Sequence, residues 1–225
     1  MNGLNVKACL GLVFLAIVMG LLLFVPAGTA QYWQAWGFPV VFFGASLLIT
    51  LHVIKKDPAF LKRRLSAGPT AEKEKSQKVI MLFMTIGFMA LLVIPALDHR
   101  FTWSSVPFYV AIAGDISTAL GFYIVFVVYK ENPFASATIE VAEDQKVIST
   151  GPYAAVRHPM YSGGALYLPG VPLALGSYWG LLVLVPMTPF LIWRLFEEER
   201  FLSKNLPGYT ECCAKVVWRL IPGVF

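Results

Sequence analysis

Two clusters of polar side chains flank a long uncharged segment near the C-terminus. The first, Gly151–Gly163, places Arg157, His158 and two tyrosines between helix-breaking glycine and proline residues. The second, Arg194–Arg200, contains three consecutive glutamates. Arginine can neutralise a carboxylate or a phosphate, and histidine can donate a hydrogen bond or move a proton near neutral pH. Because polar clusters beside a membrane-embedded segment are costly unless they bind something, the two clusters suggest one site where the membrane ends.

The second cluster is expected to lie on one helix. Arg194 and Glu198 are four residues apart and therefore share a helical face. Glu197 and Glu198 point about 100° apart, so only one of the two is expected to face the site. The alternatives are a solvated helix end for the glutamates and an Arg157 side chain that extends to lipid headgroups.

The elements that must position these clusters are membrane helices. The chain of 225 residues is 57% hydrophobic and only 14% charged, which excludes an ordinary soluble domain. Four windows before the clusters are long enough to cross a hydrocarbon core of about 30 Å. They lack the alternation of a membrane barrel, so they are predicted to be helices. These windows are Ala8–Val25, Trp36–Ile54, Val79–Leu97 and Val106–Tyr129. The first could alternatively be a cleaved signal peptide.

The distribution of lysine and arginine predicts the topology. The loop Lys55–Lys78 is rich in both residues, whereas Pro26–Ala35 is uncharged. Because basic loops stay in the cytoplasm, this loop and the N-terminus are expected to lie inside. The short loops near Gly28 and Thr102 are expected to lie outside. Of the 18 Lys and Arg residues, only Arg100 then falls on the outer side.

The uncharged segment Gly163–Trp193 is predicted to form a hairpin. One straight helix of this length would reach about 46 Å and would leave the two clusters on opposite faces of the membrane. Pro169, Pro172 and the pair Gly176-Ser177 are expected to break it into two legs instead. The hairpin returns the second cluster to the cytoplasmic side, beside the first. Its first leg, roughly Gly164–Leu175, is short for a full crossing.

The predicted fold is therefore an all-α integral membrane protein with one membrane domain, residues 1–225. Residues 1–130 are expected to supply four N-terminal transmembrane helices. Residues 131–225 are expected to form the cofactor-binding and catalytic region, with the helical hairpin and a cytoplasmic tail helix. This tail helix, Glu197 to about Val217, is expected to be interrupted at Pro207-Gly208.

Two titratable residues interrupt the predicted spans. Asp115 lies deep in the fourth span, where Ser117 and Thr118 could donate hydrogen bonds to it. An intramembrane carboxylate is a functional candidate by default, although a structural contact between helices is a close alternative. His52, near the cytoplasmic end of the second span, is expected to be interfacial.

Other common kinds of site are not indicated by the sequence. Cys9 lies in the first span, while Cys212 and Cys213 are adjacent, so the three cysteines predict reduced thiols and no disulfide framework. No phosphate-binding loop, dinucleotide fingerprint or zinc motif occurs, and neither a metal site nor a nucleic-acid partner is predicted. The loop Lys55–Lys78 is expected to face anionic membrane lipid. No feature of the sequence indicates an oligomeric state.

Together these motifs resemble those of a known family. The resemblance is to the isoprenylcysteine carboxyl methyltransferases and, more broadly, to the membrane methyltransferase superfamily that includes phospholipid N-methyltransferases. It covers about Asn132–Phe225. It is carried by Gln145–Tyr153, by Arg157-His158-Pro159-Met160-Tyr161, by Arg194 with Glu197–Glu199, and by Pro207-Gly208-Tyr209.

The resemblance implies S-adenosyl-L-methionine (SAM) as the cofactor, bound on the cytoplasmic side. The family's cofactor segment opens with histidine where this chain has Gln145, so contacts there are expected through backbone groups. Arg194 would face the acceptor and, with Arg157 and His158, is a catalytic candidate. The implied cofactor-binding residues are Gln145, Lys146, Val147, Ile148, Tyr153, His158, Pro159, Met160, Tyr161 and Glu198.

The implied reaction is methyl transfer to a lipophilic acceptor that enters sideways from the bilayer. Such a displacement needs orientation and desolvation more than covalent catalysis. The acceptor could be an isoprenylcysteine-type carboxylate or a phospholipid-like molecule. Two rival classes remain. Arg-His-Pro-x-Tyr also occurs in NADPH-dependent membrane reductases of sterol or isoprenoid double bonds, and a transporter or lipid-binding protein would need no catalytic group.

Overall fold

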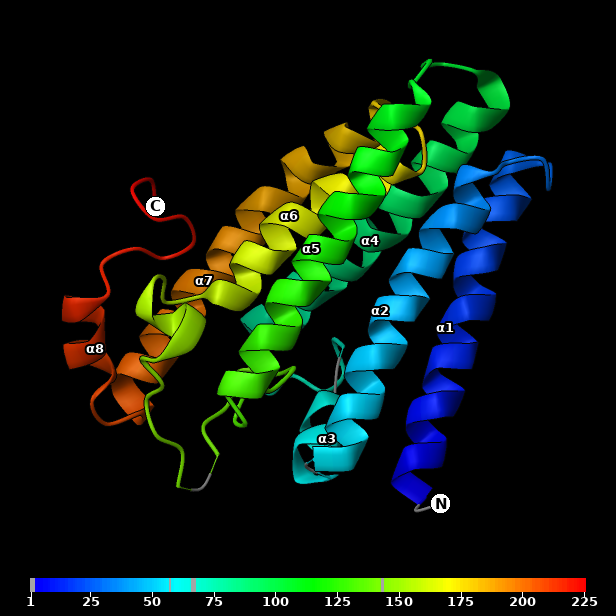
Figure 1. Ribbon diagram of the computed structural model, residues 1–225. Helices are drawn as coiled ribbons and strands as arrows, with labels where there is room; N and C mark the ends of the chain where they lie inside the picture. Colours follow the sequence, from blue (N-terminus) through cyan, green and yellow to red (C-terminus); the bar gives the residue numbers. More distant parts are fainter. Residues whose placement is uncertain (1–2, 57, 66–67, 143) are drawn as a thin grey trace.

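The computed structural model describes residues 3–56, 58–65, 68–142 and 144–225, and the regular structure in this part of the chain is entirely helical (Figure 1). Five segments are long and apolar enough to cross a membrane: α1, α2, α4, α5 and Trp179–Asn205. The predicted all-α integral membrane fold is thus confirmed. In chain order the elements are α1 (Gly3–Ala27), α2 (Gln34–Lys56), α3 (Pro58–Leu65), α4 (Lys75–Phe101), α5 (Phe108–Glu131), the 3-10 helix η1 (Gly151–Ala154), α6 (Pro159–Ala174), the 3-10 helix η2 (Trp179–Val183), α7 (Leu184–Asn205) and α8 (Tyr209–Lys215).

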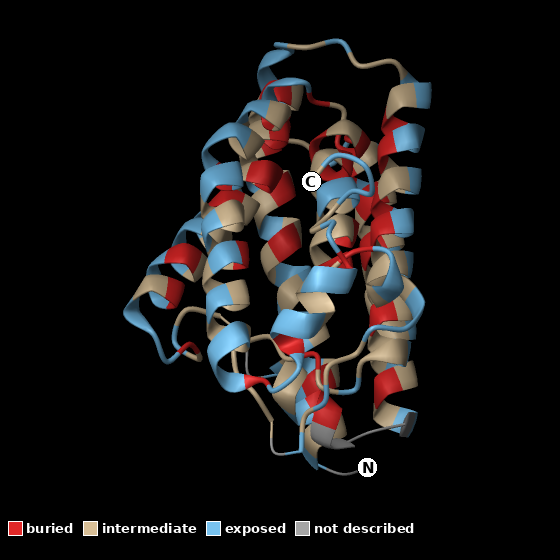
Figure 2. Ribbon diagram, turned by 90° about the vertical axis from the view of Figure 1, so that its left-hand side faces the viewer, coloured by how far each residue is buried: buried red, intermediate tan, exposed pale blue. Residues whose placement is uncertain are grey.

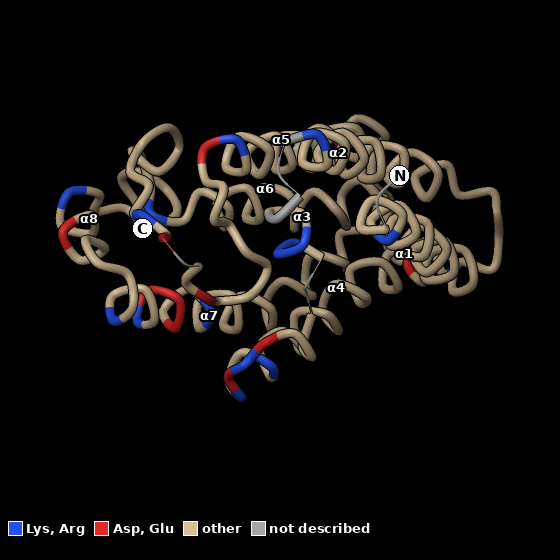
Figure 3. Tube along the Cα trace, turned by 90° about the horizontal axis from the view of Figure 1, so that it is seen from below, with Lys and Arg blue, Asp and Glu red and all other residues tan. Residues whose placement is uncertain are grey.

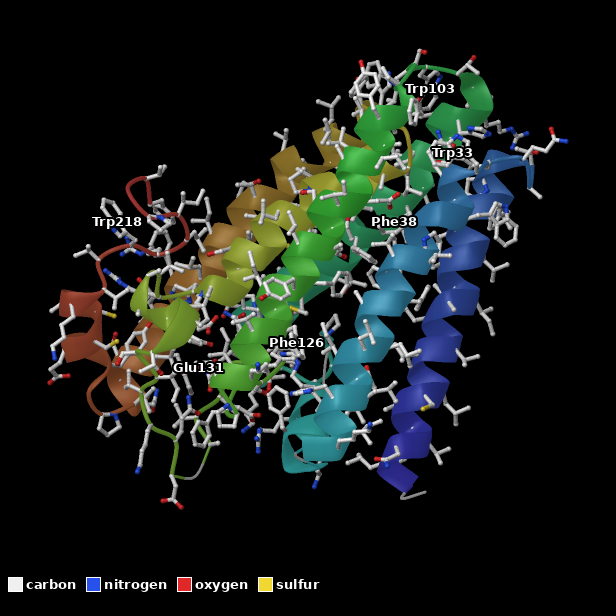
Figure 4. The ribbon with its side chains drawn as sticks, viewed as in Figure 1. Trp33, Phe38, Trp103, Phe126, Glu131 and Trp218 are labelled. Atoms are coloured by element: carbon white, nitrogen blue, oxygen red, sulfur yellow. The ribbon has the colours of Figure 1, made fainter. Side chains whose placement is uncertain are left out.

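The helices bury one face inside the bundle, and the opposite, exposed face is also apolar. Buried residues face the inside of the bundle (Figure 2), while Phe14, Val40 and Leu48 are among many large apolar side chains that stay exposed. So much exposed apolar surface suits contact with lipid. Trp33 and Trp103 lie at the end opposite to Glu131 (Figure 4), as expected for aromatic residues at a membrane interface.

The loop between the second and third spans contains a helix that the sequence analysis missed. The short helix α3 begins at Pro58 and lies at the same end of the bundle as the N-terminus (Figure 1). Phe60 and Leu61 of this helix are buried and pack with Ala8 and Val53. Asp57, Ser66 and Ala67 of the predicted basic loop, and Met1 and Asn2 of the N-terminus, lie outside the described residues.

The predicted hairpin is present, but its break lies at a single place. α6 runs through Pro169 and Pro172 and ends at Ala174, so the prediction that these prolines break the segment was wrong. Membrane helices tolerate proline where neighbouring groups satisfy the freed carbonyls. The turn comes at Gly176, whose φ of 72° lies in the left-handed region that favours glycine. α7 then returns to the end of the bundle where α6 began (Figure 1).

A buried carboxylate ties this hairpin turn to the loop after α4. Asp98 accepts hydrogen bonds from the Ser104 backbone N–H at 2.7 Å, from the Ser104 hydroxyl, and from the Ser177 hydroxyl at 2.5 Å. Ser177 Oγ in turn accepts the Gly180 N–H at 3.0 Å. Nearby, the Tyr32 hydroxyl donates to the Leu175 carbonyl at 2.6 Å. These bonds join three loops at the end of the bundle opposite to the polar clusters.

We expect Asp98→Ala to lower the free energy of unfolding by about 3 kcal/mol, because it leaves buried donors without their charged acceptor. The measurement is the thermal unfolding midpoint of the purified protein in detergent. Asp115→Ala is the control, since Asp115 Oδ1 has no hydrogen-bond partner among the described residues. Equal midpoints for the two variants would contradict the structural role of Asp98.

The helices α5 and α6 touch through glycines, in a pattern that the sequence analysis did not use. Gly114 and Gly121 of α5 meet Gly163 and Gly170 of α6. A Cβ added to Gly121 would lie 2.6 Å from the Gly163 carbonyl oxygen, and one added to Gly163 would lie 2.9 Å from that of Gly121. Small residues allow such close backbone approach in membranes. This contact fixes the start of α6 beside the end of α5.

Asp115 and His52 lie away from the polar clusters. The carboxylate of Asp115 faces α2, with Oδ2 3.9 Å from where a Cβ of Gly37 would be. Ser117 donates to the Leu166 carbonyl at 2.8 Å instead of to Asp115, so that proposed partnership was wrong. The His52 ring packs edge-on against Phe126, with ring centroids 4.9 Å apart.

Candidate active site

A cavity of about 450 Å³ lies where α6 begins and α7 ends. Most of its lining comes from the loop between α5 and α6, from the start of α6, from the C-terminal half of α7 and from α8. Every residue predicted to bind the cofactor or to act in catalysis lines it. These are Gln145, Lys146, Val147, Ile148, Tyr153, Arg157, His158, Pro159, Met160, Tyr161, Arg194 and Glu198. The two sequence clusters thus meet at one site, as the hairpin prediction requires, while the role of each residue stays a prediction.

The three consecutive glutamates face three directions. Glu197 forms a surface ion pair with Arg200 at 2.6 Å. Glu198 lines the cavity, where its Oε2 accepts a hydrogen bond of 2.6 Å from the Tyr161 hydroxyl. Glu199 faces the C-terminal tail. The helical geometry predicted that only one of Glu197 and Glu198 would face the site, and Glu198 is that residue.

Glu199 holds the first cluster in place. Its Oε1 is 3.0 Å from Arg157 Nη1 and 3.3 Å from His158 Nε2, and its Oε2 is 3.1 Å from Arg219 Nε. The sequence analysis singled out Glu198 and did not assign Glu199. Figure 3, seen from this end, shows charged residues of α7 and α8 lying on the same side as the C-terminus.

Arg157 and His158 also bind the backbone of the C-terminal tail. Arg157 donates from Nε to the Val216 carbonyl at 2.7 Å and from Nη2 to the Val217 carbonyl at 3.0 Å. The backbone N–H groups of Arg157 and His158 donate to the carbonyls of Trp218 and Arg219. His158 also precedes Pro159, the first residue of α6, and its carbonyl accepts N–H bonds in that turn. These contacts favour a positioning role for Arg157 over the catalytic role predicted for it.

The loop between α5 and α6 forms one wall of the cavity. The Gln145 side chain accepts the Ala142 N–H at 2.9 Å, and the Gln145 N–H donates to the Ala142 carbonyl at 3.1 Å, so Gln145 shapes a turn of this loop. The Tyr153 hydroxyl accepts a hydrogen bond of 2.9 Å from Asn132. Burial raises the pKa of Tyr153 to about 12, against the effect of that hydrogen bond. The Tyr153 phenol is therefore neutral at pH 7 and can donate its proton in a hydrogen bond.

Arg194 has partners that the sequence analysis missed. Its Nη1 lies 2.8 Å from the carboxylate of Glu72 and donates to the Gln77 side-chain oxygen at 2.8 Å, while Nη2 donates to the Ala137 carbonyl at 3.1 Å. Glu72 and Gln77 belong to the basic loop and the first turn of α4. The weak signal in the sequence was that two acidic residues, Glu72 and Glu74, lie close together in a loop rich in lysine and arginine.

Part of the cavity lining precedes the predicted catalytic region 131–225. Arg64 of α3 and Met81 and Met84 of α4 line it. Arg64 donates to the Ser136 carbonyl at 2.7 Å and so connects α3 to the loop between α5 and α6. The cavity therefore combines an apolar side, where α4 and α7 contribute Met81, Met84 and Leu191, with a polar side around Glu198 and the tyrosines.

Residues 109–207 match the protein-family model described as phospholipid methyltransferase. The match spans α5, the loop wall, α6 and α7, and it contains both polar clusters. It confirms the resemblance to the isoprenylcysteine and phospholipid methyltransferase superfamily. In a comparison with curated proteins, none matches the chain.

Proposed function

Because its segment 109–207 matches the phospholipid methyltransferase family model, we propose that this multi-pass membrane protein transfers a methyl group from SAM to a lipophilic acceptor. The observation that carries the proposal is the single cavity in which the two polar clusters meet. The distribution of basic residues supports a cytoplasmic location for the cavity end of the bundle.

The residues of the cavity fit SAM by size and by chemistry. A volume of about 450 Å³ lies within the usual range for pockets that bind small molecules. Glu198 can accept hydrogen bonds from an ammonium or a ribose, and Val147 and Ile148 supply apolar surface for an adenine. The Tyr209 hydroxyl is buried at the same cavity beside the weakly bonding thiol of Cys213, so it can also form a hydrogen bond with a ligand.

The side chains of the cavity orient the reaction more than they take part in it. Bound SAM would supply a methyl group on a sulfonium, whose sulfur keeps the bonding electrons when the methyl leaves. Arg194 would hold an acidic group of the acceptor in line with that methyl. A carboxylate oxygen needs no base and yields a neutral ester, whereas an amine acceptor must first lose a proton. The apolar side chains of Met81, Met84 and Leu191 would exclude water.

The acceptor is proposed to be a lipophilic molecule with an oxyanion near the atom that is methylated. An isoprenylcysteine-type carboxylate and a phospholipid-like headgroup both meet this description, since each brings an anion that an arginine can bind. The family match favours the phospholipid-like class. The helices expose apolar surface to lipid, so such a molecule could approach from within the bilayer.

Two assays test the proposed function. Isothermal titration of the purified protein with SAM and with S-adenosylhomocysteine should give micromolar binding, which corresponds to about −8 kcal/mol. Incubation with labelled SAM and extracted membrane lipids, followed by mass spectrometry, should transfer the label to a lipid. Protein that binds neither ligand but binds NADPH would support a reductase instead. Protein that binds none of the three would support a transporter or lipid-binding role.

We expect Glu198→Ala to weaken SAM binding by roughly 10- to 100-fold, because charged hydrogen bonds contribute about 1.5–3 kcal/mol. The substitution also removes the acceptor of the Tyr161 hydroxyl. Titration calorimetry with SAM provides the measurement. Glu197→Ala is the matched control, since Glu197 pairs with Arg200 at the surface and should leave SAM affinity unchanged. Equal affinities for the two variants would remove Glu198 from the cofactor site.

A further inference from the structure

The guanidinium of Arg194 is held by a segment outside the region that matches the methyltransferase family. Glu72 lies between α3 and α4, and its side chain is only 3% exposed. Gln77, which is also buried, follows in the first turn of α4. The Oε1 atoms of Glu72 and Gln77 each lie 2.8 Å from Arg194 Nη1. The N-terminal half of the chain therefore fixes a side chain that the C-terminal half places at the cavity.

These contacts leave one edge of the guanidinium available. An arginine has five N–H donors, and the contacts with Glu72, Gln77 and the Ala137 carbonyl can use three of them. The Nε–H and one Nη2–H take part in none of these three contacts, and the Tyr161 hydroxyl lies next to the guanidinium on the cavity side. Two parallel N–H groups match the two oxygens of a carboxylate or phosphate. Arg194 lines the cavity, so this edge is the one that an acceptor oxyanion could meet.

Glu72 also cancels the charge of Arg194. Without that carboxylate, a largely buried guanidinium would lose its counter-ion and would be free to turn toward Glu198, four residues along the same helix. The other acidic residue of this segment, Glu74, is exposed. Glu72 is therefore the residue of the basic loop that aligns the guanidinium, whose neighbours on the cavity side are Tyr161 and Glu198.

We propose that Glu72 is the positioning residue for Arg194 and that it determines how the site recognises the oxyanion of its acceptor. The proposal rests on the proposed methyl transfer and deepens it. In it, the pair Glu72–Arg194 presents two aligned N–H groups with little net charge. The acceptor is recognised by the geometry of its oxyanion, and Glu72 acts only through Arg194.

A double-mutant cycle with Glu72→Gln and Arg194→Lys tests this role. The turnover number and the KM for the acceptor lipid are measured with the full-length protein, and SAM affinity is measured by calorimetry. Glu72→Gln should lower kcat/KM for the acceptor roughly tenfold. It should leave the SAM dissociation constant within about threefold, because Glu72 does not line the cavity. The double variant should be no worse than Arg194→Lys alone, because Glu72 acts through the guanidinium geometry that lysine lacks.

Controls separate this role from a general effect on folding. Glu74→Gln removes the same charge from the same segment and should behave as wild type. Glu72→Asp keeps the charge but shortens the side chain, so it should partly lower kcat/KM for the acceptor. In the Arg194→Lys background, Glu72→Asp should cause no further decrease. Folding of each variant is verified by gel filtration and thermal unfolding. If the Glu72→Gln protein does not fold, the double-mutant cycle of Glu72→Asp with Arg194→Lys tests the positioning role.

The outcomes distinguish this inference from the proposed function. The positioning role would be overturned if the losses of kcat/KM from Glu72→Gln and Arg194→Lys added in the double variant. It would also be overturned if Glu72→Gln and Glu74→Gln lowered kcat/KM equally. Neither outcome would contradict methyl transfer by the wild-type protein. A wild-type protein that neither binds SAM nor transfers its methyl group would overturn the proposed function and, with it, the role of Glu72.

Discussion

Replacing Arg194 by alanine is expected to lower turnover by roughly 100- to 1,000-fold, the range found when one well-placed donor is removed from an active site. The SAM dissociation constant should change only a few-fold, because Arg194 is predicted to face the acceptor. Arg194→Lys should restore only part of the activity, since an ammonium cannot present two parallel N–H groups. Steady-state kinetics with the acceptor lipid and calorimetry with SAM measure the two effects separately.

The control for Arg194 is Arg200→Ala. Arg200 lies on the same helix but is exposed and pairs with Glu197. Arg194→Ala leaves Glu72 as a buried charge without its counter-ion, so its stability must be measured alongside its activity. If Arg194→Ala abolished SAM binding and Glu198→Ala spared it, the roles assigned to the two residues would be reversed.

Substitution of Gly121 by leucine is expected to prevent the protein from folding or to destabilise it by at least about 3 kcal/mol. The new Cβ would lie 2.6 Å from the Gly163 carbonyl oxygen, so α5 and α6 would have to separate. Because His158 directly precedes α6 and Tyr161 lies in its first turn, the cavity would be lost with the contact. The yield of monodisperse protein in detergent and its thermal unfolding midpoint are the measurements.

A matched glycine distinguishes this contact from a general effect of leucine. Gly44 lies inside α2, and apart from its chain neighbours and the nearby backbone of α2 itself, no described atom lies within 4 Å of the position that its Cβ would take. Gly44→Leu should therefore fold with a midpoint close to that of the wild type. A Gly121→Leu protein with the same yield and midpoint would mean that the two helices do not meet as described.

The spans and the hairpin could be predicted because membranes impose strong constraints on a sequence. Apolar length predicts the four N-terminal helices, and the need to bring Glu198 to the same side as His158 predicts the return of α7. Every candidate site residue lies at the cavity because the motifs are short and local. The resemblance to the methyltransferase superfamily identified these residues as one set, and the predicted hairpin explained how the two polar clusters reach the same cavity.

The missed features all depend on partners far apart in the sequence. Glu72 lies in a basic loop, where a carboxylate usually contacts solvent, and nothing nearby indicates that Arg194 is its partner. Pro169 and Pro172 were expected to help Gly176-Ser177 break the segment, because proline breaks a helix where no neighbouring helix supports the backbone. Gly114 and Gly121, like Gly163 and Gly170, repeat on one helical face, but that spacing alone does not indicate which helix each pair contacts.

The glycine contact between α5 and α6 also has a mechanical consequence. Two backbones in direct contact have no side chains that could rotate to let them slide, so these helices should move as one stiff unit. The interface of α4 with α7 is softer, because at Gly87 it is filled by the flexible side chain of Met187. A lipid acceptor would have to enter between helices, and the product would have to leave the same way. The more flexible interface of α4 with α7 is the side that would open, and the Glu72–Arg194 ion pair lies on that side.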